Sequence, residues 1–175
     1  AIDFNQIKIP KKIDGGIIFG YEVPDPENYG VIELDKKNNI KRIIEKPKIP
    51  NSNVICPGLY IYNSSVIEVA KKLKPSSRNE LEITDINSYF LKKKKLKLQH
   101  LNMGTVWLDA GNSEALFQAA QYVKTIQERH NILIGSPESI SFQNNWISKK
   151  KLNKLIISMN ESNYKRNLMF FYKNI

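Results

Sequence analysis

The sequence predicts a mixed α/β fold, a sheet of strands with helices packed against it, followed by a helical C-terminal part. Short apolar runs of strand length alternate with segments in which apolar residues recur every three or four positions. From about residue 131 only helical patterns remain. We therefore expect residues 1–130 to form one domain and residues 131–175 a helical subdomain.

The first third of the chain is expected to supply most of the strands. Residues 17–23 are continuously apolar, which is typical of a strand covered on both faces. Residues 29–35 and 40–47 are predicted to pair as a hairpin, because the asparagines of the turn at 36–39 tolerate positive φ. Pro47 cannot donate a ladder hydrogen bond and should end the second strand.

The rest of the first domain should alternate helices and strands. Residues 48–55 are expected to form a loop, and the remaining elements are a strand at 58–62, a short helix after Asn63-Ser64, a strand at 96–101 and a long helix at 113–130. Ser77 and Glu80 have the S-x-x-E spacing of a capping box, which predicts that a further helix begins there. Asn112 or Ser113 should cap the long helix.

The stretch 105–111 has the pattern of a short apolar strand that ends in Asp109, before a turn at Gly111. A carboxylate at the end of a buried strand is costly and is normally balanced by a cation or a group of donors. We therefore expect Asp109 to bind a metal ion. The alternative is that Asp109 only caps the helix that follows.

Composition narrows the class of protein. The net charge is +10, but of the 27 basic residues only four are arginine, the side chain most used for base and phosphate forks. A solvated lysine-rich surface is therefore favoured over a nucleic-acid-binding module. A single cysteine, Cys56, excludes an internal disulfide and fits the cytoplasm. No apolar run reaches the roughly 20 residues that span a bilayer.

Five motifs occur in an order and at a spacing that resemble the glucose-1-phosphate thymidylyltransferase family of sugar nucleotidyltransferases. They are Y-G-V-I-E at 29–33, E-K-P at 45–47, G-L-Y at 58–60, R-N-E-L-E-I-T-D at 78–85 and W-L-D-A-G at 107–111. The resemblance implies a mostly parallel sheet of the nucleotide-diphospho-sugar transferase type. It also implies that dTTP and α-D-glucose 1-phosphate give dTDP-glucose and pyrophosphate with Mg²⁺, for dTDP-rhamnose and cell-surface polysaccharide such as the O-antigen of lipopolysaccharide. A homotetramer is implied as well.

The resemblance also implies roles for individual residues. Lys46 and Arg78 would hold the sugar phosphate, Glu45 would take the glucose hydroxyls, and Asp109 would be one of two aspartates on Mg²⁺. The other substrate-binding positions implied are Gly30, Cys56 through its backbone, Tyr60 and Trp107. Simpler alternatives remain: a solvated lysine, a surface arginine, a strand-entry glycine and aromatic core residues.

The family's Gly-rich nucleotide loop and its second metal aspartate do not occur in residues 1–175. The domain at 1–130 would then be the sugar-phosphate-binding part of the nucleotidyltransferase domain, without its nucleotide-binding N-terminal part. The chain is expected to be a fragment of such an enzyme, which the lack of an initiator Met favours, or an inactive remnant or assembly piece. A family member that uses another nucleotide is a further alternative.

Overall fold

The computed structural model describes residues 7, 9–102 and 104–175. The chain divides into two compact units between Thr105 and Val106. The sequence had placed a boundary at residue 130, after the long helix rather than before it. Each unit is described by itself.

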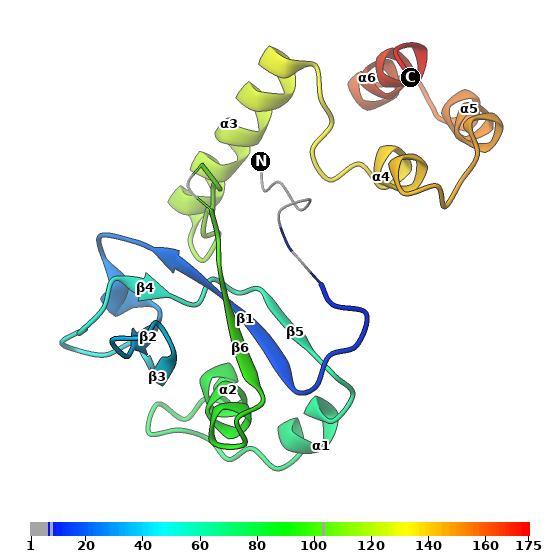
Figure 1. Ribbon diagram of the computed structural model, residues 1–175. Helices are drawn as coiled ribbons and strands as arrows, with labels where there is room; N and C mark the ends of the chain where they lie inside the picture. The colour runs from blue at the N-terminus through cyan, green and yellow to red at the C-terminus, as the bar shows by residue number, and fades with distance from the viewer. Residues whose placement is uncertain (1–6, 8, 103) are drawn as a thin grey trace. The chain divides into compact units, whose positions relative to one another are not determined.

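The first unit contains a six-stranded sheet and two α-helices (Figure 1). The elements are β1 (Gly16–Glu22), a 3-10 turn (Pro26–Asn28), β2 (Gly30–Leu34), β3 (Ile40–Glu45), β4 (Val54–Ile55), β5 (Tyr60–Tyr62), α1 (Val66–Ala70), α2 (Ile83–Lys92) and β6 (Leu96–His100). The strands follow the order β3-β2-β4-β1, with β5 and β6 also paired to β1. β1 is therefore the central strand, and its buried residues confirm the prediction from continuous apolarity.

The mixed α/β class is confirmed, but the sheet is not mostly parallel in the described residues. Only β1 and β6 pair in parallel, whereas β1 pairs antiparallel with β4 and β5, and β2 with β3 and β4. The length of the connection between two strands explains their direction of pairing. A short turn joins β2 to β3 and can only produce antiparallel neighbours, while the parallel pair needs the long crossover through α1 and α2.

The β2–β3 hairpin agrees with its prediction in detail. Asn38 has a φ of 61°, and the Asp35 carboxylate accepts the backbone N–H of Lys37 at 2.7 Å and of Asn39 at 2.9 Å. One prediction was wrong nearby. Residues 54–55 form β4 rather than loop, since Val31 and Tyr21 pair with Ile55 from both sides. The strand predicted at 58–62 is confirmed but is shorter, because β5 comprises only Tyr60–Tyr62.

A hydrophobic core cluster of the first unit consists of Ile18, Ile32, Ile43, Val54 and Cys56. The helix α2 contacts β3, β1 and β6 and buries Ile86 and Phe90. At a hydrophobic transfer free energy of about 25 cal/mol per Å², such burial is the main stabilising contribution. No helix in the described part of the chain is both long enough and apolar enough to cross a bilayer.

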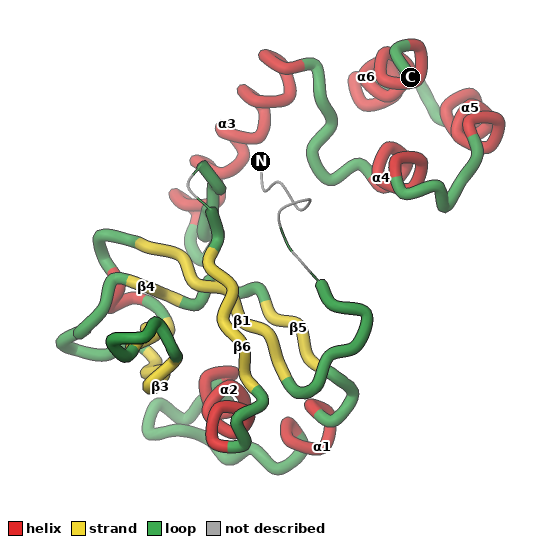
Figure 2. The backbone as a smooth tube through the Cα atoms, in the orientation of Figure 1, coloured by secondary structure: helices red, strands yellow, loops and turns green. Residues whose placement is uncertain are grey.

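Over residues 106–175, its described part, the second unit is built from helices and loops only (Figure 2). They are α3 (Ser113–His130), α4 (Pro137–Gln143), α5 (Lys149–Ser158) and α6 (Asn163–Lys173). The Asn112 side chain caps α3 by accepting the backbone N–H of Ala115 at 2.9 Å, as expected. The buried residues Leu152, Ile156 and Leu168 join α5 to α6. The expected helical C-terminal part is therefore present.

Candidate functional site

Gly30 and Glu45 lie opposite each other at the start of β2 and the end of β3. A Cβ atom on Gly30 would lie 3.1 Å from the Glu45 carboxylate and 3.4 Å from the Thr84 hydroxyl. The Gly30 carbonyl accepts the backbone N–H of Cys56 at 2.8 Å. The absence of a side chain at Gly30 therefore lets the Glu45 carboxylate lie close to the backbone of β2. Gly30 does more than begin the strand.

Two side chains orient the Glu45 carboxylate. The Thr84 hydroxyl, in the first turn of α2, donates to Oε2 at 2.5 Å, and an Arg78 guanidinium nitrogen lies 3.8 Å from Oε1. The Glu45 side chain is 22% exposed, so one side of it still faces solvent. A half-buried, oriented carboxylate of this kind can accept hydrogen bonds from the hydroxyls of a small polar molecule.

Arg78 is placed by the loop that precedes α2. Its guanidinium lies 2.8 Å from a Glu80 oxygen and 3.5 Å from a Glu82 oxygen, and Ser76 donates to Glu82 at 2.9 Å. With Glu45 this makes three carboxylates around one cation. The side chain is 35% exposed, so it can still reach an anion in solvent. A phosphate would bind here in competition with these carboxylates.

The capping box expected at Ser77 and Glu80 is absent. Glu82 is the N-cap position of α2 and makes no side-chain capping bond, while the Glu80 carbonyl instead accepts the Ser76 N–H at 2.8 Å. Asn79 has a φ of 60°, which turns the chain before a helix could begin. The loop between Ser76 and Glu82 therefore replaces the expected first turn of the helix, and it carries Arg78.

Lys46 follows β3 with its side chain exposed and a φ of 43°. Left-handed φ is uncommon for a lysine, and the following Pro47 restricts the residue further. The Lys46 N–H donates to the Tyr29 carbonyl at 3.0 Å, which holds this conformation. Such an outlier typically costs on the order of 1 kcal/mol and supports a functional role for the position.

Cys56 and Tyr60 lie between the candidate site and the hydrophobic core. Cys56 is a buried member of the core cluster, and Tyr60 packs against that cluster. Burial raises the pKa of the Cys56 thiol to about 11, and burial also raises the pKa of the Tyr60 hydroxyl. Both groups are therefore neutral at pH 7, and Cys56 is an unreactive core thiol. Tyr60 packs on the core cluster and against the Tyr62 ring, whose centroid is 6.1 Å away. Most contacts of Tyr60 are therefore those of a core residue, which was the alternative to its expected role in binding substrate.

Trp107 and Asp109 belong to the second unit, and the strand predicted for their stretch is absent. No strand pairs with it among the described residues, because the ladder to β1 ends when the Leu101 N–H donates to the Gly20 carbonyl. Leu108 is 41% exposed and Asp109 is exposed, so the premise of a buried strand end was wrong. Asn112, not Asp109, caps α3, so the capping alternative fails as well.

The described residues contain no group of three or more His, Cys, Asp or Glu side chains arranged to hold a metal ion. The three carboxylates around Arg78 are Glu45, Glu80 and Glu82, and they do not form such a group. Asp109 offers one exposed carboxylate, whose Oδ2 would lie 2.9 Å from a Cβ on Gly111. Its chemistry suits Mg²⁺, which often takes only one or two protein carboxylates and completes its shell with substrate phosphates.

Five of the predicted substrate residues are joined by the contacts above: Gly30, Glu45, Cys56, Tyr60 and Arg78. Thr84 and Glu82 were missed as site residues. A signal for Thr84 existed, because Thr84 and Asn87 are polar residues three apart on the face of α2 that otherwise buries Ile86 and Phe90. Both are buried, and Asn87 accepts from the Tyr62 hydroxyl at 2.5 Å.

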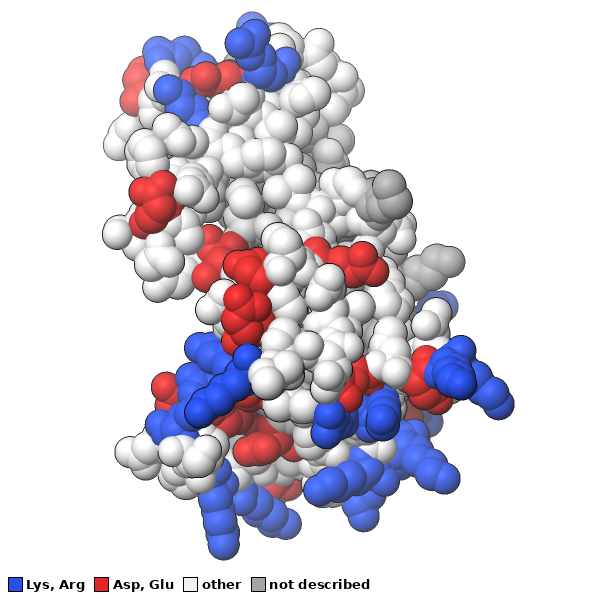
Figure 3. All heavy atoms as spheres, turned by 90° about the vertical axis from the view of Figure 1, so that its left-hand side faces the viewer, with Lys and Arg blue, Asp and Glu red and all other residues white. Residues whose placement is uncertain are grey.

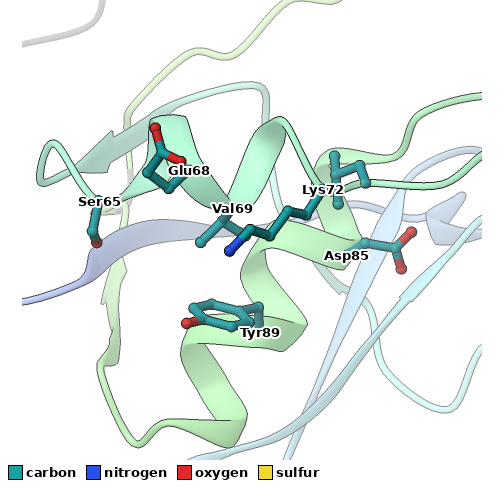
Figure 4. A pocket seen from close by; sticks show the side chains of 7 residues that line it. Ser65, Glu68, Val69, Lys72, Asp85 and Tyr89 are labelled. Atoms are coloured by element: carbon teal, nitrogen blue, oxygen red, sulfur yellow. The ribbon is translucent and has the colours of Figure 1, made fainter.

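A separate hollow of about 360 Å³ lies between α1 and α2 and contains none of these residues (Figure 4). Lys72, Tyr89, Glu68 and Asp85 are among the residues that line it, as Figure 4 shows. Its opposite charges are already balanced, and Glu68 pairs with Lys71 at 2.9 Å. We therefore keep the Glu45–Arg78 cluster as the candidate site.

The chain belongs to the nucleotidyl transferase family, whose model matches residues 5–126. Among its relatives, a glucose-1-phosphate thymidylyltransferase of Neisseria gonorrhoeae is 44% identical over 139 residues, 79% of this chain and 48% of the relative. The enzyme of that name from Neisseria meningitidis is 40% identical over 159 residues, 91% of this chain and 55% of the relative. The chain thus spans about half the length of the relatives that it matches.

Solved structures agree with the fold. A Bacillus anthracis protein, crystallised with a sucrose and described as a glucose-1-phosphate thymidylyltransferase, is 37% identical with a TM-score of 0.58. The match covers 70% of this chain and 46% of that protein. A UDP-glucose pyrophosphorylase in complex with UDP-glucose is 26% identical with a TM-score of 0.55, over 63% of this chain and 44% of the other.

Proposed function

We propose that this chain supplies the sugar-phosphate half of a glucose-1-phosphate thymidylyltransferase. The enzyme would join α-D-glucose 1-phosphate to dTTP and release pyrophosphate, with dTDP-glucose as the product. The observation that carries the proposal is the carboxylate of Glu45, held by Thr84 and Arg78 over the bare backbone of Gly30. The names of the relatives supply the substrates.

In this proposal Glu45 accepts hydrogen bonds from the glucose hydroxyls. Arg78 and Lys46 meet the sugar phosphate, the arginine as a fork and the lysine as a mobile point charge. Gly30 leaves room for the sugar ring against β2, and Tyr60 offers it apolar surface. The phosphate oxygen then attacks the α-phosphorus of the nucleotide, so these residues act by positioning and by neutralising charge.

We further propose that Asp109 gives one ligand to a Mg²⁺ ion bound together with nucleotide phosphates. The ion would neutralise charge on the phosphate oxygens. Because one protein carboxylate is a sparse site and no Gly-rich phosphate loop occurs in the sequence, the isolated chain is expected to bind the sugar phosphate without turning it over. We also propose that the whole enzyme is a cytoplasmic homotetramer and that its product enters dTDP-rhamnose and lipopolysaccharide synthesis.

Two measurements test the proposal. Titration calorimetry of this chain with glucose 1-phosphate should show saturable binding that Arg78→Met weakens and that glucose alone does not reproduce. A polypeptide of full family length that carries these residues should release pyrophosphate only when glucose 1-phosphate, dTTP and Mg²⁺ are all present. No release from a folded preparation would refute the thymidylyltransferase assignment, and turnover by the isolated chain would refute its expected inactivity.

The similar proteins differ in the nucleotide that their names specify. The likeness to a UDP-glucose pyrophosphorylase favours one specific alternative, a family member that uses UTP. Comparing dTTP with UTP in the same pyrophosphate assay decides between them, because each nucleotide serves as the control for the other.

A further inference from the structure

A second surface of the first unit carries a different chemistry. A hollow of about 850 Å³ opens between the tip of the β2–β3 hairpin, the end of α2 and β6. Its apolar floor contains Ile40, Leu96 and Leu98, all of which pack against the core cluster. Its rim is formed by the exposed residues Lys41, Lys94 and Lys97. We call this surface the lysine groove.

The three lysines of the lysine groove make no ion pair with any described residue. None of the described residues that line the groove is Asp or Glu. Eight ion pairs occur among the described residues, including those of Lys71 and Lys95, and none involves the three groove lysines. On the face shown in Figure 3, by contrast, several Lys and Arg side chains lie beside Asp and Glu side chains. The groove therefore differs from an ordinary mixed surface.

The lysine groove also lies between two free strand edges. β3 pairs only with β2, and β6 pairs only with β1, in the part of the chain that the structure describes. Ile40 and Lys41 begin β3, while Leu96 to Leu98 lie on β6, so the hollow touches both edges. Unpaired strand edges present backbone N–H and C=O groups in a row and readily take an added strand.

We propose that the lysine groove binds an extended segment of a partner protein in which aliphatic residues alternate with Asp or Glu. In an extended strand, successive side chains point to opposite faces. One set would pack on the apolar floor, and the other would place carboxylates among Lys41, Lys94 and Lys97. The backbone of the segment would add to the free edge of β3 or β6. This interaction is independent of the proposed sugar-phosphate site.

The test uses the whole chain and an acetylated eight-residue peptide that alternates glutamate and valine. We expect saturable binding that weakens as salt is raised, with slower amide exchange in β3 or β6 on binding. The variant Lys41→Gln/Lys94→Gln/Lys97→Gln should bind about tenfold more weakly. The matched control, Lys124→Gln/Lys150→Gln/Lys154→Gln, removes the same net charge from helices of the second unit and should bind as the wild type does.

Three outcomes would overturn the proposal. One is no saturable binding at millimolar peptide. Another is equal affinity for a peptide of the same composition with all glutamates before all valines, since that would show attraction by charge alone. The third is that phosphatidylglycerol vesicles, and not the peptide, bind through the three lysines, which would make the groove a membrane-surface site. Circular dichroism of each variant verifies that the comparison is between folded proteins.

Discussion

The Thr84 hydroxyl donates to the Glu45 carboxylate at 2.5 Å, which ties the first turn of α2 to the end of β3. The two residues are 39 positions apart in the sequence, and only the packing of α2 on the sheet brings them together. Because Thr84 is buried and Glu45 is half-buried, this bond fixes where the carboxylate of the candidate site can point.

Thr84→Val should therefore weaken glucose 1-phosphate binding. The substitution keeps the shape of the side chain but removes the donor, at a typical cost of about 1.5–3 kcal/mol for a hydrogen bond to a charged group. That corresponds to a loss of affinity of roughly 10- to 150-fold, measured by titration calorimetry. Thr84→Ser restores the hydroxyl and should recover most of the affinity. Equal affinities for the valine and serine variants would show that the bond does not orient the site.

Gly30→Ala should weaken the same binding for a steric reason. The added Cβ would lie 3.1 Å from the Glu45 carboxylate and would displace it. We expect a loss of stability of about 1 kcal/mol, the low end for overpacking, together with at least a fivefold loss of affinity. Gly58→Ala is the control, because a Cβ on Gly58 would have no atom within 4 Å. If both variants bind equally well, the close approach at Gly30 has no role in binding.

Glu33 should make the first unit sensitive to acid. Its carboxylate is buried, accepts two hydrogen bonds from Arg42 at 2.6 and 2.8 Å, and accepts a third from Asn51 at 3.2 Å. Hydrogen bonding from Arg42 lowers the pKa of Glu33 below its ordinary value of 4.5. The stabilisation is therefore complete above that ordinary value and is lost as the pH falls through the folded-state pKa.

Arg42→Met should lower the thermal midpoint at pH 7 by on the order of 5 °C and flatten its dependence on acid pH. The control is Lys71→Met, which removes an exposed ion pair with Glu68 and should change the midpoint little. Differential scanning calorimetry between pH 3 and pH 7 measures both. A midpoint for Arg42→Met that still falls with acid as steeply as the wild type would contradict this account.

Leu168→Ala should destabilise the second unit locally. Leu168 is fully buried with Leu152 and Ile156, and removing a buried leucine side chain typically costs about 2–5 kcal/mol. Hydrogen exchange should then lose protection in α5 and α6. Phe170→Ala is the control, because Phe170 lies on the same helix and is half exposed. Equal loss of protection in the two variants would show that the cluster is not the core of this unit.

Much of the fold could be predicted because it depends on local signals. The turn of the hairpin, the Asn112 cap and the strand-length apolar run of β1 each follow from residues that are neighbours in the sequence. The failures lie where distant residues decide. β4 exists because β1 and β2 pair with it, and the stretch before Asp109 is not a strand because no described strand pairs with it.

The sequence by itself determined the motif order, the family and the residue types that suit a sugar phosphate. It could also suggest Glu45, Lys46 and Arg78, since carboxylates and cations next to strand ends and loops are local features. Only the tertiary structure decided that Gly30, Glu45, Arg78 and Thr84 form one cluster. The physical reason is that hydrogen bonds and ion pairs act over a few ångströms, and the fold sets which distant side chains come that close.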